Sequence, residues 1–235
     1  MYTYDMRVGF SQSNKDKLMT IPAIIDTFQD CSCFHYDDIG VGFDYLEPIN
    51  LVWIINYWEV EIQRHPRYGS RITVGTFPYD FKGFFGYRNF FLEDEDGYMV
   101  KANSLWILMD WANMRPAKVT KEMVEGYVTE PKLEMDYSSR KILIPENSEK
   151  SEADPIVITG HHLDSNGHVN NGQYIKIATG SFNISDDIRK LRAEYRVQAH
   201  QGDEIYPVSY RTNDSITVSL NDADGNAYCV IEFTC

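Results

Sequence analysis

The amino-acid sequence predicts an α+β protein made of two tandem units, each with one helix followed by several antiparallel strands. An internal repeat is the main evidence: residues 60–74 (VEIQRHPRYGSRITV) resemble residues 193–207 (AEYRVQAHQGDEIYP), and residues 87–100 resemble residues 215–228. In both members of the second pair, an alternating run meets an Asp-Gly pair and continues as another alternating run. That pattern is typical of a β-hairpin.

A helix is predicted before the strands of each unit. In the first unit Thr20 can cap a helix whose first turn contains Pro22. Its apolar residues recur at helical spacing, namely Ile21, Ile24, Ile25, Phe28 and Cys31. In the second unit Asn170 or Asn171 can cap a helix that Gly180 would close.

The predicted organisation is a first unit over residues 1–128, a connector over 129–155 and a second unit over 156–235. The connector contains three prolines and the polar run SEKSEAD. We therefore expect it to cross between the units with little core of its own. The two units are expected to pack side by side, with sheets that can be continuous.

Composition excludes several classes of function. With 235 residues, 43% of them hydrophobic, the chain can fill a sizeable core. The net charge of -13 disfavours nonspecific nucleic-acid binding, and no apolar run approaches the ~20 residues of a membrane helix. The first residues show no signal-peptide or transit pattern, and the four cysteines have no CxxC spacing. We expect a cytoplasmic protein with reduced thiols.

The candidate site is the polar segment HHLDSNGHVNNGQY at residues 161–174, directly before the second predicted helix. Backbone N–H groups at a helix N-terminus favour negative charge, such as an oxyanion. A solvated loop is the plain alternative. In the first unit, however, Lys17 to Thr20 occupy the matching place of His168 to Asn171, and this much simpler segment also starts a helix. The polar cluster therefore indicates one specialised site per chain.

Metal binding and serine chemistry are alternatives for the same segment. His161, His162, Asp164 and His168 are potential ligands, but their spacing matches no standard zinc pattern and no cysteine is nearby. Ser165 follows Asp164, yet the chain has no GxSxG elbow. No metal and no cofactor are therefore expected.

Three segments resemble a known family. LDSNGHVNNGQYI (163–175) resembles the D-x-N-x-H-V-N-N-x-x-Y motif of the acyl-acyl-carrier-protein thioesterases of plants and bacteria. AEYRVQAHQGDEI (193–205) resembles that family's second motif, and SLWILMDWANMRPAKV (104–119) resembles the end of its first domain. The resemblance covers nearly the whole chain in the right order. It implies a double hotdog fold, in which each half wraps an antiparallel sheet around a central helix and the halves pack as an internal pseudo-dimer.

The resemblance also implies an activity, the hydrolysis of the thioester of fatty acyl-acyl carrier protein. Free fatty acid is released and chain elongation ends. By motif position, Asp164, Asn166 and His168 are expected to be catalytic or substrate-orienting. An aspartate can accept a proton from water or attack the carbonyl itself, and a histidine can donate a hydrogen bond or protonate the leaving thiol. Acyl carrier protein is the expected partner, and a homodimer is left open.

The second motif departs from the plant pattern, which has Glu-Cys where this chain has Gln198-Ala199. A glutamine amide can position water but cannot deprotonate it, so Asp164 is expected to carry more of the basic chemistry. His200, on the same face of a predicted strand, can stand in, whereas Glu194 would lie about 13 Å away along that strand. Two other functions stay open: an acyl-thioester-binding module with weak or no turnover, and a hotdog hydratase or dehydratase.

The acyl pocket and the docking surface complete the predictions. Residues expected to contact substrate are Ile24, Phe28, Trp53, Trp106 and Asn171, each with ordinary core packing as the plain alternative. Because acyl carrier proteins and this chain are both acidic, docking requires a local basic patch. The predicted patch is Arg189, Lys190, Arg192 and Arg196, with Arg64, Arg67 and Arg71 at the matching place in the first half.

Overall fold

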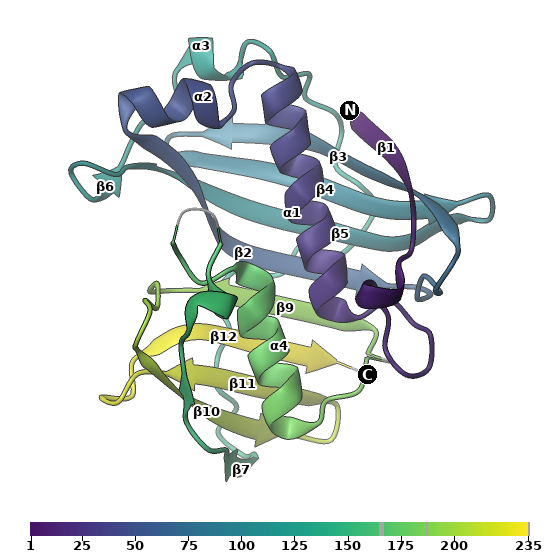
Figure 1. The fold of residues 1–235 in the computed structure, drawn as a ribbon, viewed down its shortest axis with the longest axis vertical. Helices are drawn as coiled ribbons and strands as arrows, with labels where there is room; N and C mark the ends of the chain where they lie inside the picture. Colours follow the sequence, from purple (N-terminus) through teal and green to yellow (C-terminus); the bar gives the residue numbers. More distant parts are fainter. Residues whose placement is uncertain (165–166, 187, 235) are drawn as a thin grey trace.

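A computed structural model describes residues 1–164, 167–186 and 188–234, which form one curved antiparallel sheet around two long helices (Figure 1). The strand order is β1-β3-β4-β5-β2-β9-β12-β11-β10-β7, with β6 beside β5 and β8 beside β10. The strands of the first half are β1 (Tyr2–Arg7), β2 (Leu51–Ile62), β3 (Arg71–Lys82), β4 (Phe85–Asp94), β5 (Gly97–Asp110) and β6 (Arg115–Pro116). Those of the second half are β7 (Glu149–Glu152), β8 (Ile156–Val157), β9 (Lys190–Tyr195), β10 (Glu204–Arg211), β11 (Ser215–Asn221) and β12 (Ala227–Thr234).

The two long helices are α1 (Ile21–Asp38) and α4 (Asn171–Phe182), and their N-caps confirm the predictions. The Thr20 side chain accepts a hydrogen bond from the Ala23 amide at 3.3 Å, and the Asn170 side chain accepts one from the Gly172 amide at 2.7 Å. The predicted helix end at Gly180 is wrong. The helix continues to Phe182 and ends at Asn183, because asparagine tolerates the left-handed conformation found there (φ 50°).

Short helices lie in the connections between these elements. They are η1 (Phe10–Gln12), α2 (Phe43–Leu46), η2 (Glu47–Ile49), α3 (Lys121–Val124) and η3 (Gly160–His162). The Asp-Gly pairs lie at the predicted hairpins, where Gly97 (φ 95°) follows the β4–β5 turn and Gly225 (φ 85°) lies between β11 and β12. A positive φ is accessible to glycine without steric cost, so the repeated pair marks a repeated turn.

The hydrophobic core lies between the helices and the concave face of the sheet. On α1, Ile24 and Phe28 are fully buried, and the Phe28 ring lies 5.3 Å from Phe90 and 6.1 Å from Trp58. The same continuous cluster includes Tyr174 and Ile175 of α4. One core is therefore shared by both halves of the chain.

The two half-sheets are joined edge to edge. Strands β2 and β9 pair in antiparallel register from Tyr57 opposite Glu194 to Glu61 opposite Lys190, so the sheet is continuous, as the sequence allowed. The helices also meet, because an added Cβ at Gly172 would lie 2.3 Å from Asp26 Oδ1 of α1. Only glycine permits this close approach of α4 to α1.

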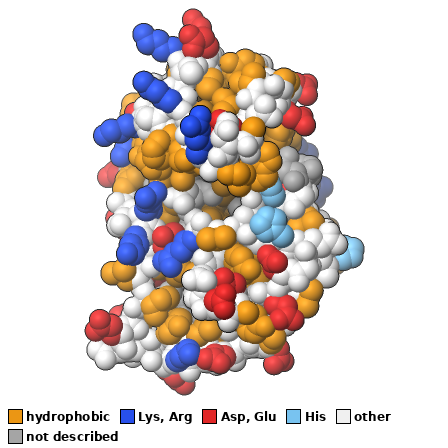
Figure 2. Space-filling view, turned by 90° about the vertical axis from the view of Figure 1, so that its left-hand side faces the viewer, with side chains coloured by type: hydrophobic (Ala, Val, Ile, Leu, Met, Phe, Trp, Pro, Cys, Tyr) orange, Lys and Arg blue, Asp and Glu red, His pale blue; other side chains and the backbone are white. Residues whose placement is uncertain are grey.

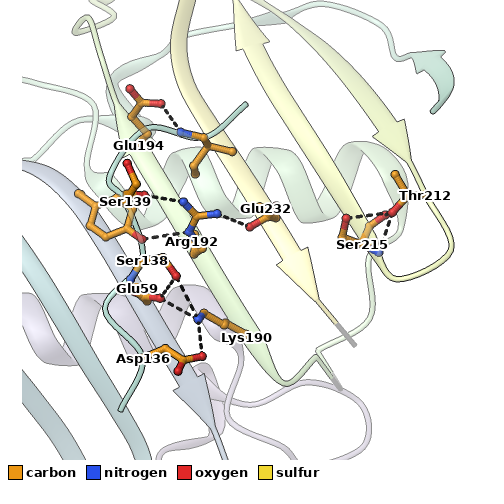
Figure 3. Close-up of polar contacts among 12 residues, drawn as sticks. Glu59, Asp136, Ser138, Ser139, Lys190, Arg192, Glu194, Thr212, Ser215 and Glu232 are labelled. Carbon is orange, nitrogen blue, oxygen red and sulfur yellow. Dashed lines mark hydrogen bonds and ion pairs between the residues drawn. The ribbon is translucent and has the colours of Figure 1, made fainter. Parts of the chain in front are cut away.

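The connector crosses the face of the sheet opposite to α1, where polar contacts hold it (Figure 3). Glu59 of β2 accepts hydrogen bonds from the Ser138 amide (2.8 Å) and hydroxyl (2.6 Å) and pairs with Lys190 at 2.7 Å. Arg192 donates to the Ser139 carbonyl at 2.6 Å. The connector also contains strand β7, which the sequence analysis did not expect. The unit boundaries at residues 128 and 155 stay a prediction.

Candidate active site

A tight turn before α4 brings Asp164 and His168 together. The Asp164 amide donates to the His168 carbonyl at 2.7 Å, and the His168 amide donates to Asp164 Oδ1 at 3.0 Å. Gly167 (φ 75°) supplies the left-handed residue in the turn. Two other residues that the sequence analysis considered, Ser165 and Asn166, lie outside the described residues. The turn therefore holds the predicted acid and imidazole beside the N-terminus of α4.

His168 lies at the junction between the two halves. Its ring centroid is 4.8 Å from that of Trp111, which follows β5 in the first half. Burial lowers the pKa of His168 below its usual 6.5; the Asp164 carboxylate opposes this shift, and the charge of His200 adds to it. The imidazole is therefore neutral at pH 7, a form that has one ring N–H to donate and one nitrogen to accept.

The side of the molecule that carries this turn and β6 is shown in Figure 2. Histidine side chains lie there beside hydrophobic side chains, and Lys and Arg side chains follow the opposite edge of the same face. Hydrophobic side chains are scattered over the whole of this face, with Asp and Glu side chains among them. No helix in the described part of the chain is long and apolar enough to cross a membrane.

Gln198 lies in a loop, because β9 ends at Tyr195. The expectation of a strand through this residue is wrong. Gln198 and His200 therefore do not share a strand face, which was the reason for considering His200 as a substitute base. The Val197 amide bonds to the Tyr228 carbonyl at 3.3 Å, and the buried Ala199 donates its amide to the Tyr174 hydroxyl at 3.0 Å. The contact with Tyr174 holds this loop against the first turn of α4. Gln198 is half-buried between the two contacts.

His200 and Glu194, the two other groups near the second motif, have separate roles in the structure. His200 is exposed, and its amide donates to Asp203 at 2.8 Å. Glu194 accepts from the Ile142 amide at 3.0 Å and pairs with Arg196 at 2.8 Å. Glu194 therefore holds the connector and does not face the turn at Asp164.

A small cavity lies between the second half of α1 and strands β2 to β5. Its volume is about 20 Å³, and the residues around it are Ser32, Tyr36, Trp53, Phe81, Gly86, Arg88, Trp106 and Tyr127. Trp53 and Trp106 line the cavity, whereas Ile24 and Phe28 lie in the packed core. Contact of any of these residues with substrate stays a prediction. Asn171 holds α4 in place, because its side chain donates to Gln29 of α1 at 2.9 Å.

The cavity also includes residues that the sequence analysis missed. Arg88 and Tyr127 line it, although neither belongs to a segment that resembles a family motif. Arg88 was detectable in principle as a lone cation in the strongly apolar strand YRNFFLED. Burial of such a residue requires compensating contacts, so a charged residue at an inward strand position is informative.

Part of the predicted docking patch is paired with carboxylates. Lys190 pairs with Glu59 and Asp136, Arg192 pairs with Glu232, and Arg64 pairs with Asp94. Lys190 and Arg192 belong to the network that fastens the connector (Figure 3). Lys190 and Arg192 are therefore paired cations of the fold, whereas Arg67, Arg71 and Arg189 are exposed. A docking role for the patch stays a prediction.

No three His, Cys, Asp or Glu side chains among the described residues are grouped so that they could hold a metal ion. The site consists instead of a carboxylate, an imidazole and backbone amides at a helix N-terminus. With one sheet wrapped around two helices and a polar turn at their junction, the chain is a double hotdog protein.

Comparison with known proteins identifies the family. Residues 1–127 match the family described as "Acyl-ACP thioesterase N-terminal domain". This chain therefore belongs to the acyl-ACP thioesterase family, as its motifs predicted.

Solved structures share the fold. The fold matches an acyl-ACP thioesterase from Bacteroides thetaiotaomicron with a TM-score of 0.87 and 20% identity, covering 99% of this chain and 96% of that one. It matches the 12:0-ACP thioesterase from Umbellularia californica with a TM-score of 0.84 and 16% identity, covering 99% and 96%. The likeness confirms the double hotdog fold over the whole chain.

Sequence relatives include the oleoyl-acyl carrier protein thioesterase 1 of Arabidopsis thaliana, a chloroplastic protein. It is 24% identical over 89% of this chain and 61% of its own length. Oleoyl-acyl carrier protein thioesterase 2 of the same plant is 24% identical over 91% and 64%. The chain thus spans about three fifths of the length of these relatives.

Proposed function

We propose that this protein hydrolyses the thioester of fatty acyl-acyl carrier protein and releases free fatty acid. The observation that carries the proposal is the pairing of Asp164 and His168 in one turn at the N-terminus of α4, against Trp111 of the other half. The printed names of the relatives, oleoyl- and palmitoyl-acyl carrier protein thioesterases, support the same substrate class.

In this proposal the Asp164 carboxylate accepts a proton from the attacking water, or itself attacks the thioester carbonyl. The amides at the start of α4 face the oxygen on which negative charge develops. The carbon–sulfur bond then breaks, and in the water route the leaving thiolate takes up the proton that Asp164 accepted. In the nucleophilic route the thiolate takes its proton from solvent, and water then hydrolyses the acyl-aspartyl anhydride to release the fatty acid and restore Asp164. Neutral His168 donates a hydrogen bond during these steps, and Gln198 and Asn166 orient water or thioester.

A module that binds acyl thioesters without turnover is the second candidate, favoured by Gln198-Ala199 in place of Glu-Cys. A hydratase or dehydratase is the third. Incubation with acyl-acyl carrier protein, followed by mass spectrometry, separates all three. Free fatty acid supports the proposal, a changed acyl chain still bound to the carrier supports the hydratase, and unchanged substrate supports the binding module.

Carrier docking is proposed for the rim at β6, where Arg115 lies four residues after Trp111. Its side chain is 73% exposed and lies 3.9 Å from its partner Asp110, so the cation stays accessible to a carrier. An exposed cation so near the site can steer an acidic carrier.

Location in the cytoplasm, assembly as a homodimer and the absence of nucleic-acid binding stay predictions from the sequence.

A further inference from the structure

Arg88 of β4 is a buried cation that has no carboxylate partner among the described residues. Only 6% of its surface is exposed. Its Nη2 group donates to His35 Nδ1 at 2.7 Å, and its Nε group donates to Thr76 Oγ1 at 3.3 Å. The guanidinium also lies 5.5 Å from the Tyr127 ring centroid and 5.8 Å from that of Phe90, and it interacts with the Tyr127 hydroxyl. A guanidinium has five N–H donors and stays protonated in proteins, so the positive charge is present and only partly hydrogen-bonded.

The groups around Arg88 do not neutralise this charge. Burial, reinforced by the Arg88 charge, lowers the pKa of His35 to about 3, so its imidazole is neutral. Burial raises the pKa of Cys31 to about 12 and also raises the pKa of Cys33 and Tyr127, so these groups are uncharged at pH 7. An isolated buried charge is costly unless a partner compensates it.

Arg88 faces the cavity between α1 and the sheet, at the end remote from His168. In the strand register Arg88 lies opposite Ser104 of β5, and Gly86 lies opposite Trp106. Trp111, whose ring contacts His168, lies seven residues after Ser104. In an extended strand, seven residues separate these two positions by roughly 23 Å. A chain that starts at the turn and follows β5 therefore passes Trp106 before it meets the guanidinium.

We propose that the acyl chain accepted by this protein has a carboxylate at the end remote from the thioester, and that Arg88 binds this carboxylate. The inference rests on the proposed function and adds the substrate class. A carboxylate supplies the missing negative charge and matches the planar fork of a guanidinium. The indoles of Trp53 and Trp106 contact the methylene segment. The cavity itself has room for about one water molecule, so the aromatic side chains must part to admit the chain.

The test compares thioesters of one small thiol that have acyl chains of equal length, one ending in a methyl group and one in a carboxylate. The wild-type protein should hydrolyse the carboxylate form with a kcat/KM at least about tenfold higher, because charge-assisted hydrogen bonds are lost with the methyl end. Arg88→Met should reverse this preference, and Arg88→Lys should retain part of it. Arg71→Met, at an exposed position of β3, is the control and should leave the ratio unchanged.

Binding of the free acids gives a second measurement that needs no turnover. Calorimetry with the wild-type protein should show tighter binding of the dicarboxylic acid than of the monocarboxylic acid of equal length. Preference for the methyl-terminated substrate and for the monocarboxylic acid would overturn the inference and leave the proposed hydrolase intact. Absence of hydrolysis of every thioester, with the dicarboxylic acid still preferred, would overturn the hydrolase and leave the anion site at Arg88. If Arg88→Met does not fold, the two wild-type comparisons decide alone.

Discussion

The carboxylate of Glu59 in β2 lies 2.7 Å from the ammonium group of Lys190 in β9, across the line where the two half-sheets meet. The Glu59 side chain is fully buried and the Lys190 side chain is 20% exposed. Glu59 also accepts two hydrogen bonds from Ser138 of the connector. A single acidic group thus joins the first half, the second half and the connector between them.

Replacement of the Glu59 carboxylate should therefore destabilise the fold. Glu59→Gln should lower the free energy of unfolding by about 3 kcal/mol, because it removes the buried charge that pairs with Lys190 and accepts from Ser138, and leaves Lys190 only its exposed partner Asp136. Urea unfolding measures the change. Glu152→Gln, which breaks the exposed pair with Lys150, should change the stability far less, because water screens that pair. Equal losses in the two variants would contradict a structural role for Glu59.

Asp164→Asn should lower thioester hydrolysis by at least about 100-fold, because the amide keeps the shape of the side chain but cannot act as a base or nucleophile. The Asn Oδ1 atom can still accept the His168 amide, so the turn is expected to persist. Asp222→Asn is the matched control, since Asp222 also accepts backbone amides in a turn. Near-normal turnover in a folded Asp164→Asn protein would remove Asp164 from the mechanism.

Gln198→Glu should keep or raise the activity, and the pH–rate profile should gain a limb that reports a carboxylate. The half-buried side chain lies in the loop after β9, where a carboxylate can bind the same water and also accept its proton. Gln201→Glu, at an exposed position of the same loop, should leave the profile unchanged. A collapse of activity without unfolding would show that the site depends on the amide.

Asp26 of α1 provides a pH-dependent stability test. Burial, with a contribution from Asp30, raises its pKa from 3.8 to about 6, and its Oδ1 atom is buried without a hydrogen bond. The folded state therefore binds more protons than the unfolded state between pH 4 and 6, so stability should fall as the pH rises through this range. Asp26→Asn should remove this fall and stabilise the protein by about 1 kcal/mol at pH 7, after allowance for solvent screening.

The matched control for Asp26 is Asp222. Hydrogen bonds donated by Asn226 hold the pKa of Asp222 below its usual 3.8. Its contribution to stability is present above the unfolded pKa and is lost as the pH falls, so Asp222→Asn should show the opposite sign. Urea midpoints measured at several pH values compare the three proteins. A wild-type protein that gains stability from pH 4 to 6 relative to Asp26→Asn would contradict the raised pKa.

Arg115→Glu tests carrier docking at the rim beside β6. Turnover of acyl-acyl carrier protein should slow several-fold at low salt, mainly through the association rate, and the difference should shrink as salt is added. Hydrolysis of a small acyl thioester should not change. Arg211→Glu, at the far end of β10, is the control. Equal losses on both substrates would mean that Arg115 shapes the site itself.

Local signals in the sequence predicted much of the fold. Thr20 and Asn170 cap the helices, and the Asp-Gly pairs at Gly97 and Gly225 turn the hairpins, because each residue acts on backbone within a few positions of itself. The end of α4 was predicted wrongly because asparagine and glycine compete for the same left-handed role, and only Asn183 occupies it.

Contacts between residues that are distant in the sequence could not be predicted from it. The charge cluster at Lys190 and Arg192 has the same composition as a docking patch, and only the fold shows that Glu59, Asp136 and Glu232 neutralise it. Gln198 follows an alternating run, but β9 ends at Tyr195, and the Arg196 and Val197 amides both bond to the Tyr228 carbonyl of the neighbouring strand β12. Long-range partners therefore decided the outcome at both places.

The continuous ladder between β2 and β9 limits how the molecule can open. A clamshell movement would have to break the backbone pairing from Tyr57–Glu194 to Glu61–Lys190 and expose the Glu59 charge pair at the same time. The protein consequently lacks a hinge at its waist. Under the proposed function, entry of an acyl chain must therefore rely on side chains and loops that shift around a fixed sheet.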